Sequence, residues 1–209
     1  MNRRIIGYYN YTVVLTYLGM VFACTGIFLA VDGKSGLSMW CLMLAGLCDM
    51  FDGAIAATKP RDEDQKRFGI QIDSLCDLIG FGVLPGVFGY MISDNKLLAA
   101  VVGIFITLAA VIRLAYFNVL EEKRQQAETG QRKAYLGVPV TTIALVLPVV
   151  YVLYFNGILP GTYWYNIATA LVGIGFLTPV YIKKPQLTGK IIIVVIGVLE
   201  AAAMLLFGR

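Results

Sequence analysis

Apolar runs of about the length of a membrane crossing recur along the whole chain, and they restrict its fold more than any other feature. A helix needs about 20 predominantly apolar residues to cross the hydrocarbon core of a bilayer. We predict seven such spans, over residues 12–31, 37–58, 69–92, 97–117, 135–155, 162–182 and 190–207. The expected fold is therefore an all-α, polytopic membrane helix bundle, with six or eight spans as alternatives to seven.

The composition and the placement of charge agree with a membrane protein. Hydrophobic residues make up 58% of the 209 residues and charged residues only 14%, against about 25% in soluble domains. If the N-terminus is cytoplasmic, most basic residues fall in inner loops, whereas the outer segments hold Lys34, Lys96 and Arg209. This asymmetry follows the positive-inside rule. We expect an integral protein of the cytoplasmic membrane, with its N-terminus and its chemistry on the cytoplasmic side.

The loops between the spans are short, so we expect one integral-membrane domain over residues 1–209. Residues 1–10, where Arg3 and Arg4 stand beside apolar and aromatic residues, suit a short interfacial helix or a flexible basic tail. They lead into the first apolar run without a small-residue cleavage site, so we expect no cleavable signal peptide. The net charge of +4 favours anionic membrane lipid as a partner, and nothing indicates nucleic acid.

The residue types that are missing limit the chemistry. The chain has no histidine, which removes the commonest general base and the commonest transition-metal ligand. Its four cysteines lie in apolar segments without CxxC spacing, so neither a disulfide framework nor a zinc site is expected. Catalysis would have to use carboxylates and cations that prefer oxygen ligands.

Four aspartates, Asp49, Asp52, Asp73 and Asp77, lie inside or at the edge of two expected spans. A carboxylate in hydrocarbon costs about 2.5–3.5 kcal/mol on insertion scales, so intramembrane acids mark functional sites. Each pair shares one face of its helix, at spacings i,i+3 and i,i+4. Because the two helices flank the loop over residues 59–68, these faces can meet just inside the cytoplasmic boundary.

Clustered carboxylates cannot all stay ionised without a counter-charge. Oxygen ligands alone favour Mg²⁺, Mn²⁺ or Ca²⁺ over zinc or copper, and such sites commonly also bind substrate phosphates. Gly53, Ala56 and Gly69 continue the acidic faces and allow close approach of a ligand or of the other helix. These features favour a substrate that contains pyrophosphate. A structural polar cluster, or the pathway of a cation- or proton-coupled transporter, is the alternative.

Residues 48–82 contain DMFDGAIAA and, after eleven further residues, GIQIDSLCD. This segment resembles the signature of the CDP-alcohol phosphotransferase family, which reads DxxDGxxAR, a short spacer and GxxxDxxxD. The chain departs from that signature at Ala57, where the family has arginine, and in its longer spacer. Lys59 or Arg61 in the enlarged loop is a candidate to replace the arginine.

The resemblance implies roles for these residues. Asp49, Asp52 and Asp73 would hold a divalent metal, Mg²⁺ or Mn²⁺ with Ca²⁺ as an alternative, on the pyrophosphate of a CDP-linked substrate. Asp77 would be the catalytic general base and a ligand of a second metal. The CDP pocket would be formed by Asp49 and Asp52 together with Gly53, Ala56, Gly69 and Thr12.

Two further segments, IRLAYFNV (112–119) and YLGVPVTT (135–142), resemble elements of the bacterial phosphatidylserine synthases within this family. That resemblance implies a homodimer that transfers a phosphatidyl group from CDP-diacylglycerol to L-serine and releases CMP. The expected contacts to the acceptor or to a lipid phosphate are Arg113, Asn118, Lys59 and Arg61. Glycerol 3-phosphate or inositol phosphate is an alternative acceptor, but their phosphates should require at least two converging basic side chains. Arg113 is the only basic residue in the interior of an expected span, since Lys190 stands at the edge of one.

Overall fold

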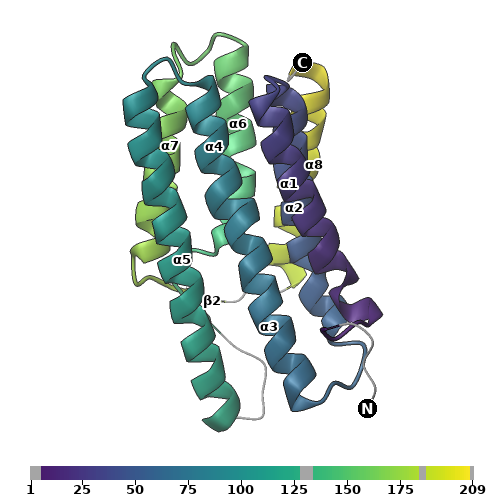
Figure 1. The fold of residues 1–209 in the computed structure, drawn as a ribbon. Helices are drawn as coiled ribbons and strands as arrows, with labels where there is room; N and C mark the ends of the chain where they lie inside the picture. The colour runs from purple at the N-terminus through teal and green to yellow at the C-terminus, as the bar shows by residue number, and fades with distance from the viewer. Residues whose placement is uncertain (1–5, 128–133, 184–186, 208–209) are drawn as a thin grey trace.

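The computed structural model describes residues 6–127, 134–183 and 187–207. The helices in chain order are α1 (Val14–Val31), α2 (Ser35–Ala56), α3 (Glu63–Asp77), α4 (Leu84–Ile92), α5 (Lys96–Ala127), α6 (Ile143–Phe155), α7 (Tyr163–Leu177) and α8 (Leu187–Phe207). Three short helical turns are η1 (Tyr11–Val13), η2 (Leu78–Val83) and η3 (Val140–Thr142), and two strands are β1 (Ala134–Leu136) and β2 (Tyr181–Lys183). Figure 1 shows the helices side by side in one bundle.

Seven helical stretches correspond in order to the seven expected spans. Four are long and apolar enough to cross a membrane: Tyr11–Val31, Ser35–Ala56, Glu63–Ile92 and Lys96–Lys123. Three shorter apolar helices follow, over Val140–Phe155, Tyr163–Leu177 and Val194–Leu206. The all-α polytopic class is thereby confirmed, while the number of crossings stays a prediction. The start of α1 and the end of α8 lie at opposite ends of the bundle (Figure 1), as an odd number of crossings requires.

Two of the expected spans were placed wrongly at one end. An antiparallel pair of strands forms between residues 134–136 and 181–183. We had assigned these residues to the ends of two helical spans or to the positions next to them. Pro139 and Pro179 explain the difference, because the residue before a proline is disfavoured in the helical conformation. The helical part of the span expected over 135–155 therefore begins at Val140, and the one expected over 162–182 ends at Leu177.

The described part of the N-terminal segment is not helical. Residues 6–10 lie in bends and extended chain, and residues 1–5 lie outside the described part of the chain. The ring of Tyr8 packs against Phe68 with 5.4 Å between the centroids, and the Tyr11 hydroxyl lies 2.9 Å from that of Thr58. The segment therefore lies across the connection between α2 and α3.

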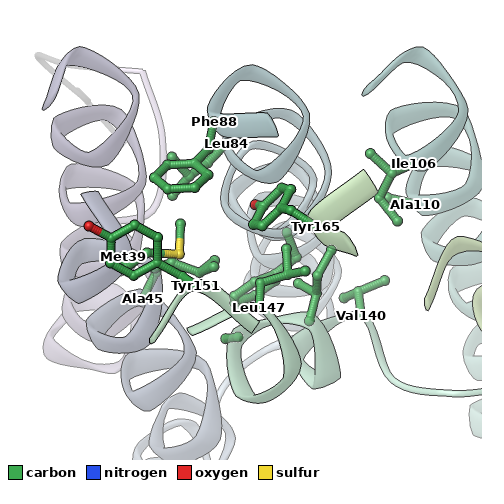
Figure 2. Packing of buried hydrophobic residues seen from close by; sticks show 14 of the residues in the cluster. Met39, Ala45, Leu84, Phe88, Ile106, Ala110, Val140, Leu147, Tyr151 and Tyr165 are labelled. Atoms are coloured by element: carbon green, nitrogen blue, oxygen red, sulfur yellow. The ribbon is translucent and has the colours of Figure 1, made fainter. Parts of the chain in front are cut away.

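The core lies among α2, α4, α5, α6 and α7 (Figure 2). Phe88 of α4 is fully buried, with its ring centroid 5.1 Å from that of Tyr165 and 5.7 Å from that of Tyr151. A Cβ added to Gly86 would lie 3.0 Å from the carbonyl oxygen of Gly103, so α4 and α5 touch through their backbones. In lipid, such close packing replaces the hydrophobic effect as the force that joins helices.

The outer faces of the long helices are apolar and exposed. Val21 and Phe28 of α1, Ile104 and Leu108 of α5, and Leu171 of α7 all have exposed side chains. In a soluble protein so large an exposed apolar surface would be unusual. In a membrane it is the surface that faces the acyl chains.

Candidate metal and CDP site

The structure brings the four aspartates of α2 and α3 together. One carboxylate oxygen from each of Asp49, Asp52 and Asp73 lies within 4.8 Å of the other two. The carboxyl group of Asp77 lies within hydrogen-bonding reach of Asp49, and that of Asp52 within reach of Asp73. Asp52 is buried, and the other three are half-buried.

Local sequence signals explain why α2 and α3 end and begin where they do. α2 ends at Ala56, shortly before Pro60, which cannot continue a helix. α3 begins after Asp62, whose side chain accepts a hydrogen bond of 2.7 Å from the backbone N–H of Gln65. This N-cap satisfies a backbone donor that the first helical turn leaves unpaired. The reversal between the two helices returns the chain to the level of Asp52.

Asp77 is the last residue of α3 and directly precedes the π-helical turn η2. Pro85 follows in the first turn of α4 and lacks the N–H that a continuous α-helix would use. A π-helical turn widens the helix locally and is frequent at functional sites.

Helix α1 completes the site. The Thr16 hydroxyl donates a 3.3 Å hydrogen bond to Oδ2 of Asp52. A cavity of about 10 Å³ is lined by Thr16 and Gly19 together with Asp49, Asp52 and Asp77. A space of that size holds about one water-sized group. Thr12, which we expected at the CDP pocket, lies one turn earlier, where it is buried and hydrogen-bonded to Asn10.

The charges of this cluster are not balanced within the described part of the chain. The two ion pairs found there, Lys34–Asp32 and Lys66–Glu63, do not include any of the four aspartates. Oδ1 of Asp73 is buried without a hydrogen-bond partner among the described residues. Buried charge needs a partner of opposite sign, and oxygen ligands alone suit a hard divalent cation. The residues therefore fit such a metal.

The small residues beside the acids differ in how much room they leave. A Cβ on Gly53 would have no heavy atom within 4 Å, so the surface of α2 beside Asp52 is open. Ala56, one turn further on, is half-buried. A Cβ on Gly69 would instead lie 3.0 Å from a guanidinium nitrogen of Arg61. Arg61 thus lies over α3, one turn before Asp73.

The other expected contact residues are spread around the site. The Lys59 ammonium lies 5.8 Å from the ring centroid of Tyr11. Arg113 is buried and donates hydrogen bonds of 3.2 Å to the carbonyl oxygens of Gly137 and Val138. Asn118 accepts a 3.0 Å hydrogen bond from Ser74, the residue after Asp73. These contacts place Asn118 and Arg61 near α3, whereas Arg113 faces the chain before α6.

Three residues at the site were not predicted from the sequence: Thr16, Ser74 and Thr141. The side chain of Thr141 lies within hydrogen-bonding reach of Asp49. Helical periodicity could have indicated Ser74, because at about 100° per residue its side chain points about 60° from that of Asp77 on α3. Thr16 and Thr141 reach the aspartates from other helices. No sequence signal near either threonine indicates that contact.

A membrane bundle with a carboxylate site for a divalent cation is the class that the fold and the site define. Residues 9–181 match the family model described as CDP-alcohol phosphatidyltransferase. The chain therefore belongs to the CDP-alcohol phosphatidyltransferase family. This result confirms the resemblance seen in the aspartate motif and decides against the transporter alternative. Enzymes of this family generally depend on a divalent metal, in agreement with the acidic cluster.

Several curated relatives are similar to the chain. An archaetidylserine synthase of Methanothermobacter thermautotrophicus is 31% identical over 82% of this chain and 69% of the relative. A CDP-diacylglycerol–serine O-phosphatidyltransferase of Saccharomyces cerevisiae is 35% identical over 52% of this chain and 40% of the relative. An enzyme of the same name from Helicobacter pylori is 30% identical over 66% of this chain and 53% of the relative. The chain thus matches about half or less of the length of the latter two relatives.

Proposed function

We propose that this protein transfers the phosphatidyl group of CDP-diacylglycerol to the hydroxyl of L-serine, which yields phosphatidylserine and CMP. The observation that carries the proposal is the convergence of Asp49, Asp52, Asp73 and Asp77 on one site in a chain of this family. Serine as the acceptor is supported by the names of the relatives, all three of which refer to serine.

Asp49, Asp52 and Asp73 would hold the divalent cation, Mg²⁺ or Mn²⁺, with Ca²⁺ as an alternative. When bound, such an ion neutralises pyrophosphate charge and stabilises the departing CMP. Asp77 contacts Asp49 and is the residue that would accept the proton of the serine hydroxyl. The serine oxygen becomes bonded to the phosphorus of the phosphatidyl group, and the bond from that phosphorus to the CMP oxygen breaks.

The open surface beside Gly53 suits the nucleotide, because a ligand can approach the backbone of α2 there. Ala56, Gly69 and Thr12 would form the rest of the CDP pocket. Arg61 is our candidate for the arginine that the family motif has at Ala57, since its guanidinium lies on the Asp73 side of the loop. Lys59, which lies over Tyr11, is the second candidate for a phosphate contact.

Asn118 would bind the acceptor. Its amide oxygen accepts from Ser74, so its N–H groups are oriented to donate to a carboxylate such as that of serine. Arg113 was also expected there, and that role stays a prediction, because its hydrogen bonds to Gly137 and Val138 use backbone carbonyls. A phosphorylated acceptor would require more converging basic groups than these.

We further propose that the protein works as a homodimer in the cytoplasmic membrane, with the site on the cytoplasmic side. The excess of basic residues in the loops at that end supports this orientation. The end of α2 that carries the acids lies beside the N-terminal segment, so both would face the cytoplasm.

The test is a CMP-release assay with purified protein in detergent, CDP-diacylglycerol, Mn²⁺ or Mg²⁺, and L-serine, glycerol 3-phosphate or inositol phosphate. CMP release that requires both metal and serine is expected. A parallel arm uses the archaetidyl counterpart of the lipid, because one relative is named for it. Release with a phosphorylated alcohol but not with serine would refute the acceptor, and no metal-dependent release with any alcohol would refute the reaction.

A further inference from the structure

Asp49 is contacted from outside α2 and α3 as well as by the other acids. The side chain of Thr141, in the turn η3 before α6, lies within hydrogen-bonding reach of the Asp49 carboxylate. Thr141 is half-buried and belongs to the YLGVPVTT segment. The contact joins the amino-terminal end of α6 to the acidic end of α2.

The packing of α2 on α6 fixes the distance between these two residues. A Cβ on Gly46 would lie only 2.8 Å from the Cβ of Ala144, so the two helices touch through these positions. Asp49 follows Gly46 by three residues, and Thr141 precedes Ala144 by three. Because the helices run in opposite directions, both residues lie about one turn from that contact, on the same side.

The chain before Thr141 is held in place from α5. Arg113 is 6% exposed and donates to the carbonyl oxygens of Gly137 and Val138, both at 3.2 Å. Gly137 donates its own N–H to the carbonyl of Val180 at 2.7 Å. Its φ of +81°, and the 3.4 Å from an added Cβ to Cζ of Arg113, explain why glycine stands there.

We propose that Thr141 is a positioning residue for Asp49, held in place by the Gly46–Ala144 contact and by the bonds from Arg113 to residues 137–138. The inference rests on the proposed function, in which Asp49 holds the metal. The Thr141 hydroxyl donates to one Asp49 oxygen and fixes the plane of the carboxylate. A carboxylate has about four lone-pair sites, so the others stay directed toward the cation. Partners of this kind typically change metal affinity by about 10–100-fold when removed.

The test measures Mn²⁺ binding to the purified, metal-free protein by electron paramagnetic resonance of the unbound ion, without CDP-diacylglycerol or serine. Thr141→Val removes the donor at nearly constant shape and should weaken Mn²⁺ binding by about 10-fold or more. Thr141→Ser retains the hydroxyl and should remain within about threefold of wild type. Thr142→Val is the matched control, because Thr142 is the neighbouring residue and makes no capping hydrogen bond. It should bind Mn²⁺ like wild type.

Wild-type Mn²⁺ affinity in Thr141→Val would overturn the proposal, as would equal losses in the valine and serine variants. If Thr141→Val does not fold, Thr141→Ala and Arg113→Lys provide the same comparison, and normal Mn²⁺ binding in both would overturn it. Failure of the proposed function is separate, because it would appear as absent serine-dependent CMP release while the pattern of Mn²⁺ affinities persisted.

Discussion

Gly46 of α2 packs directly against Ala144 of α6, because an ideal Cβ on Gly46 would lie only 2.8 Å from the Cβ of Ala144. The pair lies about one helical turn from Asp49, so the spacing of the two helices and the position of Asp49 depend on it. Small residues at such positions allow helices in lipid to pack closely.

Gly46→Ala should therefore affect the fold and the site together. The added methyl group must displace α6, and overpacking of this kind costs about 1–3 kcal/mol. We expect a lower thermal unfolding temperature in detergent and weaker Mn²⁺ binding. Gly197→Ala is the control, since a Cβ at Gly197 of α8 has no heavy atom within 4 Å. Equal behaviour of the two variants would show that the Gly46 contact is not needed.

Substitution of Asp77 should lower turnover alone, whereas substitution of Asp52 should also impair metal-dependent substrate binding. Asp77→Asn lacks the proposed base, so turnover should fall by about 10²–10⁴-fold while CDP-diacylglycerol still binds. Asp52→Asn removes a proposed metal ligand and should also abolish metal-dependent binding of CDP-diacylglycerol. Equilibrium binding and CMP release on the same preparations separate the two effects. Asp32→Asn, which changes an exposed carboxylate, serves as the control. Near-normal turnover of Asp77→Asn would contradict its role as the base.

Gly53→Ala separates ligand binding from folding. The methyl group meets no protein atom, and alanine favours a helix over glycine by roughly 0.5–1 kcal/mol. The variant should be at least as stable as wild type. Its KM for CDP-diacylglycerol should rise by about 10-fold, because the methyl group occupies the space in which the nucleotide would contact α2. Gly197→Ala should leave KM unchanged. An unchanged KM in Gly53→Ala would place the nucleotide elsewhere.

Arg61 and Lys59 can be distinguished by substitution. A hydrogen bond to a charged group contributes about 1.5–3 kcal/mol, so Arg61→Ala should reduce kcat/KM for CDP-diacylglycerol by at least about 10-fold. Lys59→Ala should have an effect of less than about threefold, because Lys59 lies over Tyr11. The reverse order of effects in steady-state kinetics would make Lys59 the replacement for the missing arginine.

The features that could be predicted from the sequence are those that depend on the periodicity of a single helix. The i,i+3 and i,i+4 spacings placed each pair of aspartates on one helical face, and the structure brings the two faces together. Asp62 as the N-cap of α3 follows a known local pattern and could have been predicted.

The features that were missed depend on contacts between distant segments. The strand pair 134–136 with 181–183 joins residues separated by two helices, and three residues carry little pattern of their own. Thr141 meets Asp49 through helix packing at Gly46, and Arg113 is bonded to backbone carbonyls, which no side-chain pattern reveals. Such contacts require the tertiary structure.

The most direct test of the central claim is the amount of phosphatidylserine and CMP formed by the purified protein from CDP-diacylglycerol and isotopically labelled L-serine, with mass spectrometry as the readout. We predict equimolar phosphatidylserine and CMP, and formation that saturates with Mn²⁺ or Mg²⁺ and stops on chelation. Asp77→Asn should form product at least about 10²-fold more slowly than wild type. Labelled phosphatidylserine at the wild-type rate in Asp77→Asn, or a wild-type protein that makes none with metal present, would contradict the account.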